Sequence, residues 1–157
     1  MSGSGGVTVH MNASPEKIWD LVSDVTKIGL YSPETFEAEW LDGATGPAVG
    51  AEFRGHVKRN GKGPIYWTNC TVLESTPGRE FAFIAGLGER RLNVWRYKLE
   101  PSGAGTDVTE SFQLADNLLL NFYWAVWGWS RGRANRNGMQ TTLERIKAEV
   151  EREVGAG

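Results

Sequence analysis

The feature that most constrains the fold is a series of short segments in which apolar and polar residues alternate. Residues 36–40, for example, place Phe36, Ala38 and Trp40 on one side and two glutamates on the other. A period of two is typical of β-strands that bury a single face. Asn60-Gly61, a strong hairpin signal, separates two such segments. The pattern predicts an antiparallel sheet with strands near residues 7–11, 36–40, 52–58, 65–73, 80–85, 95–100 and 107–114.

Helical patterns flank the six later strands. Ser14 is suited to cap a helix that starts at Pro15, and apolar residues follow it at helical spacing. A second short helix is predicted around residues 26–30, ending before Ser32-Pro33. A long C-terminal helix is predicted by apolar residues that recur every three or four positions, namely Met139, Leu143, Ile146 and Val150.

These elements predict an α+β protein. A half-polar sheet needs a cover for its apolar face, and the C-terminal helix alone has the length to supply one. We therefore expect a curved antiparallel sheet of about seven strands wrapped around that helix, with two short helices after the first strand. The helix and the concave side of the sheet would enclose a space. We expect residues 1–6 to form a flexible tail and residues 7–153 a single domain.

Composition and motifs exclude several classes of protein. The 157 residues include 17 Lys and Arg against 19 Asp and Glu, for a net charge of −2, which disfavours a nucleic-acid binder. The single cysteine, Cys70, excludes an intramolecular disulfide. No apolar run is long enough for a membrane span, and no secretion signal is apparent, so we expect a cytoplasmic protein. Without a phosphate loop, an HExxH or GxSxG motif, or a carboxylate and histidine cluster, we expect no cofactor and no metal.

Alternation also predicts which side chains face the enclosed space. Strand 65–73 is ambiguous, because either the set with Tyr66 and Cys70 or the set with Trp67 and Asn69 fits the inner face; we favour the Trp67 set. Both histidines fall on outward positions, which argues against histidine as a general base. The expected inner residues on the other strands are Val7, Val9, Met11, Phe36, Ala38, Trp40, Phe53, Gly55, Val57, Trp95, Tyr97, Leu99, Val108, Glu110, Phe112 and Leu114.

Glu110 is a carboxylate within an otherwise apolar inward set. Burial of a carboxylate without a partner is unfavourable and raises its pKa. If residues 102–105 turn the chain so that Pro101 opposes Thr106, Tyr97 lies opposite Glu110 and its hydroxyl can reach the carboxylate. Glu110 is then a polar anchor or general acid in a ligand cavity, or else a structural carboxylate bonded to the backbone or an arginine.

Residues 118–129 are almost wholly apolar and aromatic, with no one-sided period. They are expected either to line the mouth of the cavity, with Phe122, Trp124 and Trp129 contacting a ligand, or to be buried in the core or in a homodimer contact. The arginines that follow, Arg131, Arg133 and Arg136, form a local basic run. This run is either a solvated helix face or a site for an anionic ligand group at the mouth.

Seven short motifs occur in a characteristic order along the chain. They are Ser14-Pro15-Glu16-Lys17-Ile18-Trp19, Val22-Ser23-Asp24, Ser32-Pro33-Glu34, Val49-Gly50-Ala51-Glu52-Phe53-Arg54-Gly55, Pro77-Gly78-Arg79-Glu80-Phe81, Trp95-Arg96-Tyr97-Lys98-Leu99-Glu100-Pro101 and Gly105-Thr106-Asp107-Val108-Thr109-Glu110-Ser111. Together they resemble the SRPBCC (START/Bet v 1-like) superfamily, which has the helix-grip fold, over roughly residues 7–150. The likeness is greatest to bacterial polyketide cyclase/dehydrase and lipid-transport-like members. It implies the fold and a hydrophobic cavity, and it does not specify a reaction.

Three functions remain open, and the first is favoured. In the first hypothesis, the protein binds a small lipid-like or aromatic molecule for transport, storage or sensing, and apolar burial supplies the affinity. Alternatively it is a cyclase, aromatase or dehydratase in which Glu110 moves a proton and Tyr97 assists. In the third hypothesis it is a regulatory protein whose cavity is filled by Phe53, Trp67, Trp95, Phe112 and Trp129. The predicted ligand-binding residues are Phe53, Trp67, Asn69, Trp95, Tyr97, Glu110, Phe112, Phe122, Trp124 and Trp129.

Overall fold

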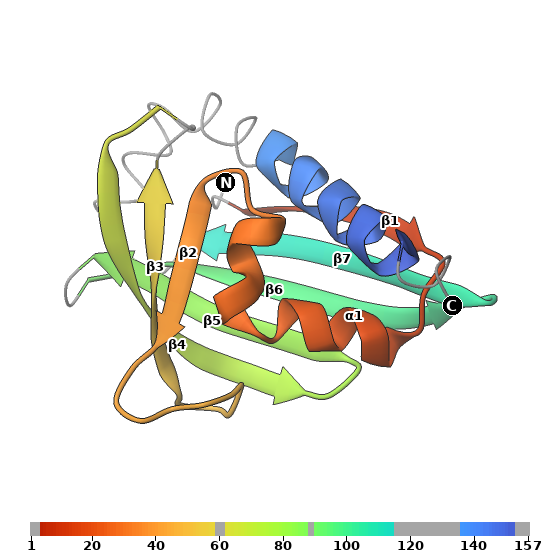
Figure 1. Ribbon diagram of the computed structural model, residues 1–157, viewed down its shortest axis with the longest axis horizontal. Helices are drawn as coiled ribbons and strands as arrows, with labels where there is room; N and C mark the ends of the chain where they lie inside the picture. The colour runs from red at the N-terminus through yellow and green to blue at the C-terminus, as the bar shows by residue number, and fades with distance from the viewer. Residues whose placement is uncertain (1–3, 59–61, 88–89, 115–135, 153–157) are drawn as a thin grey trace.

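The computed structural model describes residues 4–58, 62–87, 90–114 and 136–152 (Figure 1). Its elements follow the predicted order: one strand, two short helices, six strands and a terminal helix. The strands are β1 (Ser4–Met11), β2 (Thr35–Trp40), β3 (Glu52–Lys58), β4 (Ile65–Thr76), β5 (Glu80–Leu87), β6 (Arg90–Ser102) and β7 (Gly105–Leu114). The helices are α1 (Pro15–Val22), the 3-10 helix η1 (Val25–Leu30) and the C-terminal helix, residues 136–152.

The seven strands form one antiparallel sheet in the order β1-β7-β6-β5-β4-β3-β2. The first strand therefore pairs with the last, and β1 and β2 form the two edges. Figure 1 shows α1, η1 and the C-terminal helix on the same side of the curved sheet. The predicted helix-grip architecture is confirmed.

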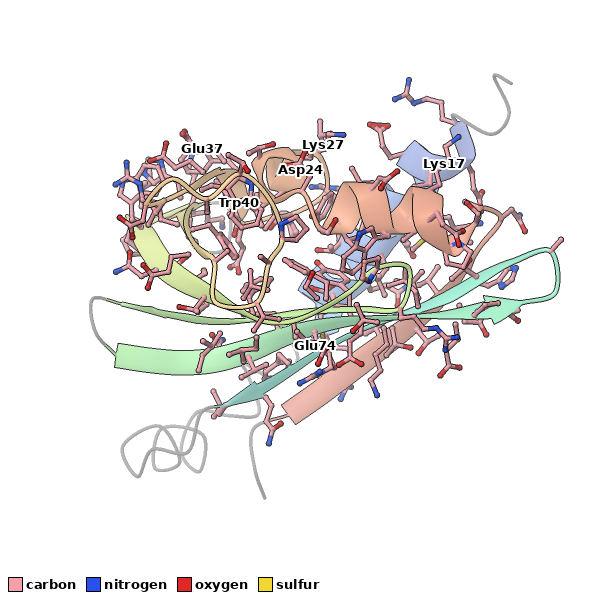
Figure 2. The ribbon with its side chains drawn as sticks, turned by 90° about the horizontal axis from the view of Figure 1, so that it is seen from below. Lys17, Asp24, Lys27, Glu37, Trp40 and Glu74 are labelled. Atoms are coloured by element: carbon pink, nitrogen blue, oxygen red, sulfur yellow. The ribbon has the colours of Figure 1, made fainter. Side chains whose placement is uncertain are left out.

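Local sequence signals account for the short helices. The Ser14 hydroxyl accepts a hydrogen bond from the Lys17 backbone N–H, and Pro15 occupies the first helical position. Asp24 caps η1 in the same way, accepting from the Thr26 N–H at 3.1 Å. Helix η1 then lies against β2, and Figure 2 shows Asp24 and Lys27 near the middle of the view, next to Glu37 and Trp40.

The core lies between the concave side of the sheet and the helices. Apolar residues of the C-terminal helix contribute to it, as their spacing predicts. The inner positions of β1, β3 and β6, and those of β7 up to Phe112, are buried or packed against the core, also as predicted, whereas Leu114 is half-buried. The buried apolar residues of the C-terminal helix are Met139, Leu143, Ile146 and Val150.

Three expectations about the strands need correction. Strand β1 begins at Ser4, so residues 4–6 belong to the sheet and not to a flexible tail; Gly5 and Gly6 pair with Phe112 and Ser111. Phe36 is 44% exposed and not inward, because the β2–β3 register shifts between Thr35 and Glu37 and turns its ring to the outer face.

On β4, the Trp67 set faces outward, contrary to our expectation. Cys70 pairs with the buried Phe53, whereas Trp67 pairs with the outward His56, so the inner set is that of Tyr66 and Cys70. Because side chains alternate, one correct pair determines the face of the whole strand. Asn69 accordingly lies outward with Trp67.

Candidate functional site

Among the residues that the structure describes, Glu110 is the only acidic or basic side chain that is buried, and 5% of its surface is exposed. It lies on the inner face of β7, between Val7 of β1 and Tyr97 of β6. The predicted register is confirmed: Tyr97 opposes Glu110 and Pro101 opposes Thr106. Ser102 also pairs with Gly105, so the turn between these strands is shorter than expected. The tight turn is what fixes Tyr97 directly across from the carboxyl group.

The carboxyl group of Glu110 is half satisfied. The Tyr97 hydroxyl donates a hydrogen bond to it, so one oxygen has a partner. The other, Oε1, is buried and accepts no hydrogen bond from any residue that the structure describes. Buried polar atoms in proteins are nearly always partnered, so an unpartnered carboxyl oxygen marks a place where a ligand group or water can bind.

A second phenol, that of Tyr31, completes the polar cluster. Tyr31 follows η1 directly, is 2% exposed, and lies near enough for the Glu110 charge to raise its pKa. Tyr31 also contributes to the raised pKa of Tyr97. Tyr31 could not be predicted as part of the site, because alternation and helical spacing do not determine where a residue at a helix end lies. Its one signal is its position before Ser32-Pro33, where the chain turns inward after the helix.

Burial controls the acid–base behaviour of this cluster. Loss of hydration raises the pKa of Glu110 to about 8, and the hydrogen bond from Tyr97 lowers it only in part. Burial likewise raises the pKa of Tyr97 and of Tyr31, with the Glu110 charge as the next cause. At neutral pH the cluster is therefore uncharged, and it consists of a carboxylic acid and two phenols.

Aromatic side chains surround the cluster on the inner face. Trp95 and Phe112 oppose each other on β6 and β7, two residues along from Tyr97 and Glu110, and their ring centroids are 5.6 Å apart. Phe53 of β3 lies farther across the sheet, where its ring centroid is 5.1 Å from that of Phe83, and Phe83 pairs with Trp95. The structure thus brings Trp95, Tyr97, Glu110 and Phe112 together on two neighbouring strands, and Phe53 belongs to the same core two strands away.

The remaining predicted ligand-binding residues do not join this group. Trp67 and Asn69 lie on the outer face, so the reason for placing them in the cavity was wrong. Trp67 also cannot fill the interior, as the hypothesis of a filled cavity required. Phe122, Trp124 and Trp129, together with Arg131 and Arg133, lie outside the described residues, and Arg136 is exposed on the C-terminal helix.

On the outer face, Trp67 forms a stack with its neighbours. The His56 ring lies parallel to it at 4.0 Å, and the Arg54 guanidinium lies over it at 4.1 Å. Phe36 contacts the His56 ring at 4.4 Å, and Glu39 binds Arg54 at 2.5 Å. Contacts of this kind stabilise a surface, and they explain why a tryptophan remains half-buried on the outer side of the sheet.

The histidines and the cysteine take no part in the site. His10 is exposed and its Nδ1 lies 2.7 Å from an Asp107 oxygen, while His56 belongs to the outer stack, so the outward prediction for both is confirmed. Cys70 is buried, and burial raises the pKa of its thiol to about 12, which keeps it unreactive.

Other features lie away from the cluster. A surface depression of about 410 Å³ is lined mainly by outward residues of β6 and β7, including Arg96 and Gln113. Among the described residues, no three His, Cys, Asp or Glu side chains are placed to hold a metal ion. None of the helices in the same part of the chain has the length and apolar character of a membrane span.

Comparison with known proteins supports this description of the fold. A family model described as "polyketide cyclase / dehydrase and lipid transport" matches residues 5–151. The solution structure of a polyketide-cyclase-like protein from Corynebacterium glutamicum is 28% identical, with a TM-score of 0.66 over 98% of this chain and 94% of that one. A START superfamily protein from Mycobacterium smegmatis is 18% identical, with a TM-score of 0.74 over 95% and 97%. No curated protein matches the chain.

Proposed function

Because the chain belongs to the polyketide cyclase/dehydrase and lipid transport family, we propose that it binds a small hydrophobic molecule between the sheet and the C-terminal helix. The bound molecule is lipid-like or aromatic, and the protein carries, stores or senses it. Apolar burial supplies the affinity, and the cluster of Glu110, Tyr97 and Tyr31 orients the molecule.

The observation that carries this proposal is the unpartnered, buried Oε1 of Glu110 within an apolar surface. A carboxyl group in such surroundings lowers the stability of the fold, and we expect ligand binding to offset this loss. A ligand whose body contacts Trp95 and Phe112, and whose polar atom bonds to Oε1, uses both the apolar and the polar parts of the surface. Few polar groups in a largely apolar pocket are typical of small-molecule sites.

The test is native mass spectrometry of the protein purified from its own cells. We expect a small lipophilic molecule to remain bound and to be released on unfolding. Substitution of Trp95 by alanine should reduce the fraction of protein that carries it, whereas substitution of the outward Trp67 should not. Protein that carries nothing, and that also fails to bind added apolar molecules, would contradict the proposal.

A second candidate is an enzyme of the cyclase or dehydratase kind, favoured by the pKa of Glu110 at about 8. A general acid or base works best when its pKa lies near the working pH. In this role Glu110 exchanges a proton with a bound poly-β-ketone, and the Tyr97 hydroxyl positions the carboxyl group. The surrounding apolar surface holds the poly-β-ketone in a folded conformation. Glu110→Gln should then abolish turnover while it leaves binding intact. Full turnover by this variant would remove the acid–base role.

A further inference from the structure

The β-bulge at the start of β2 places two consecutive side chains against one histidine. The β2–β3 register shifts between Thr35 and Glu37, so Phe36 is the extra residue and Glu37 pairs with His56. A bulge can direct a side chain to a face that regular alternation would not give it. Here the Phe36 ring lies 4.4 Å from the His56 ring, and a Glu37 carboxylate oxygen lies 3.6 Å from His56 Nδ1. We call these three residues the bulge cluster.

The His56 ring lies between two aromatic rings on the outer face of the sheet. Phe36 belongs to β2 and Trp67 to β4, the strands on either side of the strand that carries His56. The Trp67 ring is nearly parallel to the imidazole, at 8° and 4.0 Å, and the Phe36 ring is tilted by 40°. The imidazole side chain is only 23% exposed as a result. Aromatic faces attract a cation, so this environment favours a protonated imidazole ring.

The Nδ1 atom of His56 is buried and has no hydrogen-bond partner among the described residues. Its distance of 3.6 Å from Glu37 Oε2 is too long for a hydrogen bond. A neutral imidazole carries one N–H group, whereas a protonated imidazole carries one on each nitrogen. Protonated His56 can therefore donate from Nδ1 to Glu37 after a small side-chain rotation. The resulting bond joins opposite charges, and such bonds are stronger than neutral ones.

The other charged groups on the outer face leave Glu37 available to His56. Arg54 lies over the Trp67 ring, on the face that His56 does not occupy, and Glu39 binds Arg54 at 2.5 Å. Asp24 caps η1 by accepting hydrogen bonds from Thr26. The charged residues of the strands around His56 and of η1 with its cap are Glu37, Glu39, Glu52, Arg54, Lys58, Glu74, Asp24 and Lys27.

From this geometry we propose that the bulge cluster is a pH-sensitive contact, which holds the edge strand β2 against β3 more tightly when His56 carries a proton. In the described sheet, β2 pairs with β3 alone, so this pairing decides how often β2 detaches. Histidine side chains gain or lose their charge between about pH 5 and pH 8. Detachment of β2 should therefore become more frequent as the pH rises through this range. The proposal goes beyond the proposed function, because the cluster lies on the outer face.

Hydrogen exchange measures this detachment directly, because a backbone amide exchanges only when its hydrogen bond opens. The amides that bond β2 to β3 are followed at about pH 5 and about pH 7.5, and each rate is corrected for the pH dependence of free-chain exchange. We compare the natural protein with His56→Gln, which keeps a polar side chain and does not titrate. The protection of β2 should fall between the two pH values at least about threefold more in the natural protein than in His56→Gln.

Two further variants identify the groups responsible. His10→Gln is the matched control, because His10 is the other histidine and contacts Asp107 at the opposite edge of the sheet. It should keep the full pH dependence of β2. Glu37→Gln keeps the shape of the side chain and removes its charge, so it should lose most of that dependence. Equal pH dependence in the natural protein and His56→Gln, or full dependence in Glu37→Gln, would overturn the proposal.

Discussion

Burial turns Glu110 into a weak acid that keeps its proton through neutral pH. The cause is lost hydration, since the described neighbours supply one hydrogen bond and no opposite charge. Such a group lowers the stability of the folded chain whenever it must ionise. It is retained at a place where ligand binding or proton transfer can use it, as perturbed carboxyl groups often are.

The stability of the protein should therefore fall as the pH rises from about 4.5 to about 8. The folded-state pKa of Glu110 lies above its ordinary value of 4.5, so in this window the folded chain holds a proton that the unfolded chain has lost. The free energy of unfolding should decrease by about 1.4 kcal/mol per pH unit from this residue. Urea unfolding of the natural protein and of Glu110→Gln at several pH values measures the difference. The exposed Glu100→Gln serves as control, and parallel curves for the natural protein and Glu110→Gln would contradict the burial argument.

Removal of the Tyr97 hydroxyl should raise the pKa of Glu110 further. The hydrogen bond from Tyr97 lowers this pKa, so Tyr97→Phe leaves the ionised form with less support. Carbon NMR of the carboxyl resonances follows the titration directly, and exposed carboxyl groups in the same spectrum act as internal controls. An unchanged or lowered Glu110 pKa would show that the hydroxyl does not contact the carboxyl group.

At the level of the elements, β4 uses its two faces differently, although both carry large side chains. Cys70 and Val72 face the core, while Trp67 joins the stack of Phe36, His56 and Arg54 on the outer side. An aromatic ring between a histidine and an arginine loses water on both faces without entering the core. Strand β4 therefore has two partly apolar faces.

Two tryptophan substitutions should separate the faces by function. Trp67→Ala removes the outer stack and should lower the free energy of unfolding by about 1–2 kcal/mol, with ligand affinity unchanged. Trp95→Ala removes part of the inner surface beside Glu110 and should weaken the binding of a small apolar probe such as isopropylnaphthalene by at least about tenfold. Urea unfolding and fluorescence titration measure the two effects. Equal losses of affinity in both variants would refute the assignment of faces.

The element order and most of the core could be predicted, because a sheet with one buried face imposes a period of two. The β6–β7 register followed from a short turn, and so did the Glu110–Tyr97 pair. The face of β4 could not be determined in this way, since hydrophobicity does not distinguish Trp67 in an outer stack from a buried tryptophan. The inward prediction for Phe36 was wrong because a bulge breaks the alternation of side chains along β2. The position of Tyr31 beside Glu110 could not be predicted, because it depends on tertiary structure alone.

In the molecule as a whole, helix η1 packs closely against β2, the strand at one edge of the sheet. A Cβ atom added to Gly29 would lie 2.3 Å from the Phe36 carbonyl oxygen. This contact is possible with glycine only, because the backbone of β2 cannot move without disturbing its pairing with β3. Tyr31, two residues later, depends on the same contact for its place beside Glu110.

Gly29→Ala should therefore destabilise the protein by about 2 kcal/mol or more and should also weaken ligand binding. Gly46→Ala is the matched control, since a Cβ there meets nothing within 4 Å. It should change the free energy of unfolding by less than about 1 kcal/mol. Thermal unfolding compares the two variants. A neutral Gly29→Ala would mean that η1 does not touch β2 as described.

The pairing of β1 with β7 affects how the chain is made on the ribosome. Strand β1 is synthesised first, yet its hydrogen-bonding partners extend to Gln113. Until Leu114 has been translated, the hairpins of β2 to β6 can form, but β1 has no β7 to pair with. The last step of sheet assembly therefore joins the two most distant strands of the nascent chain, and folding should be slow for a protein of this size.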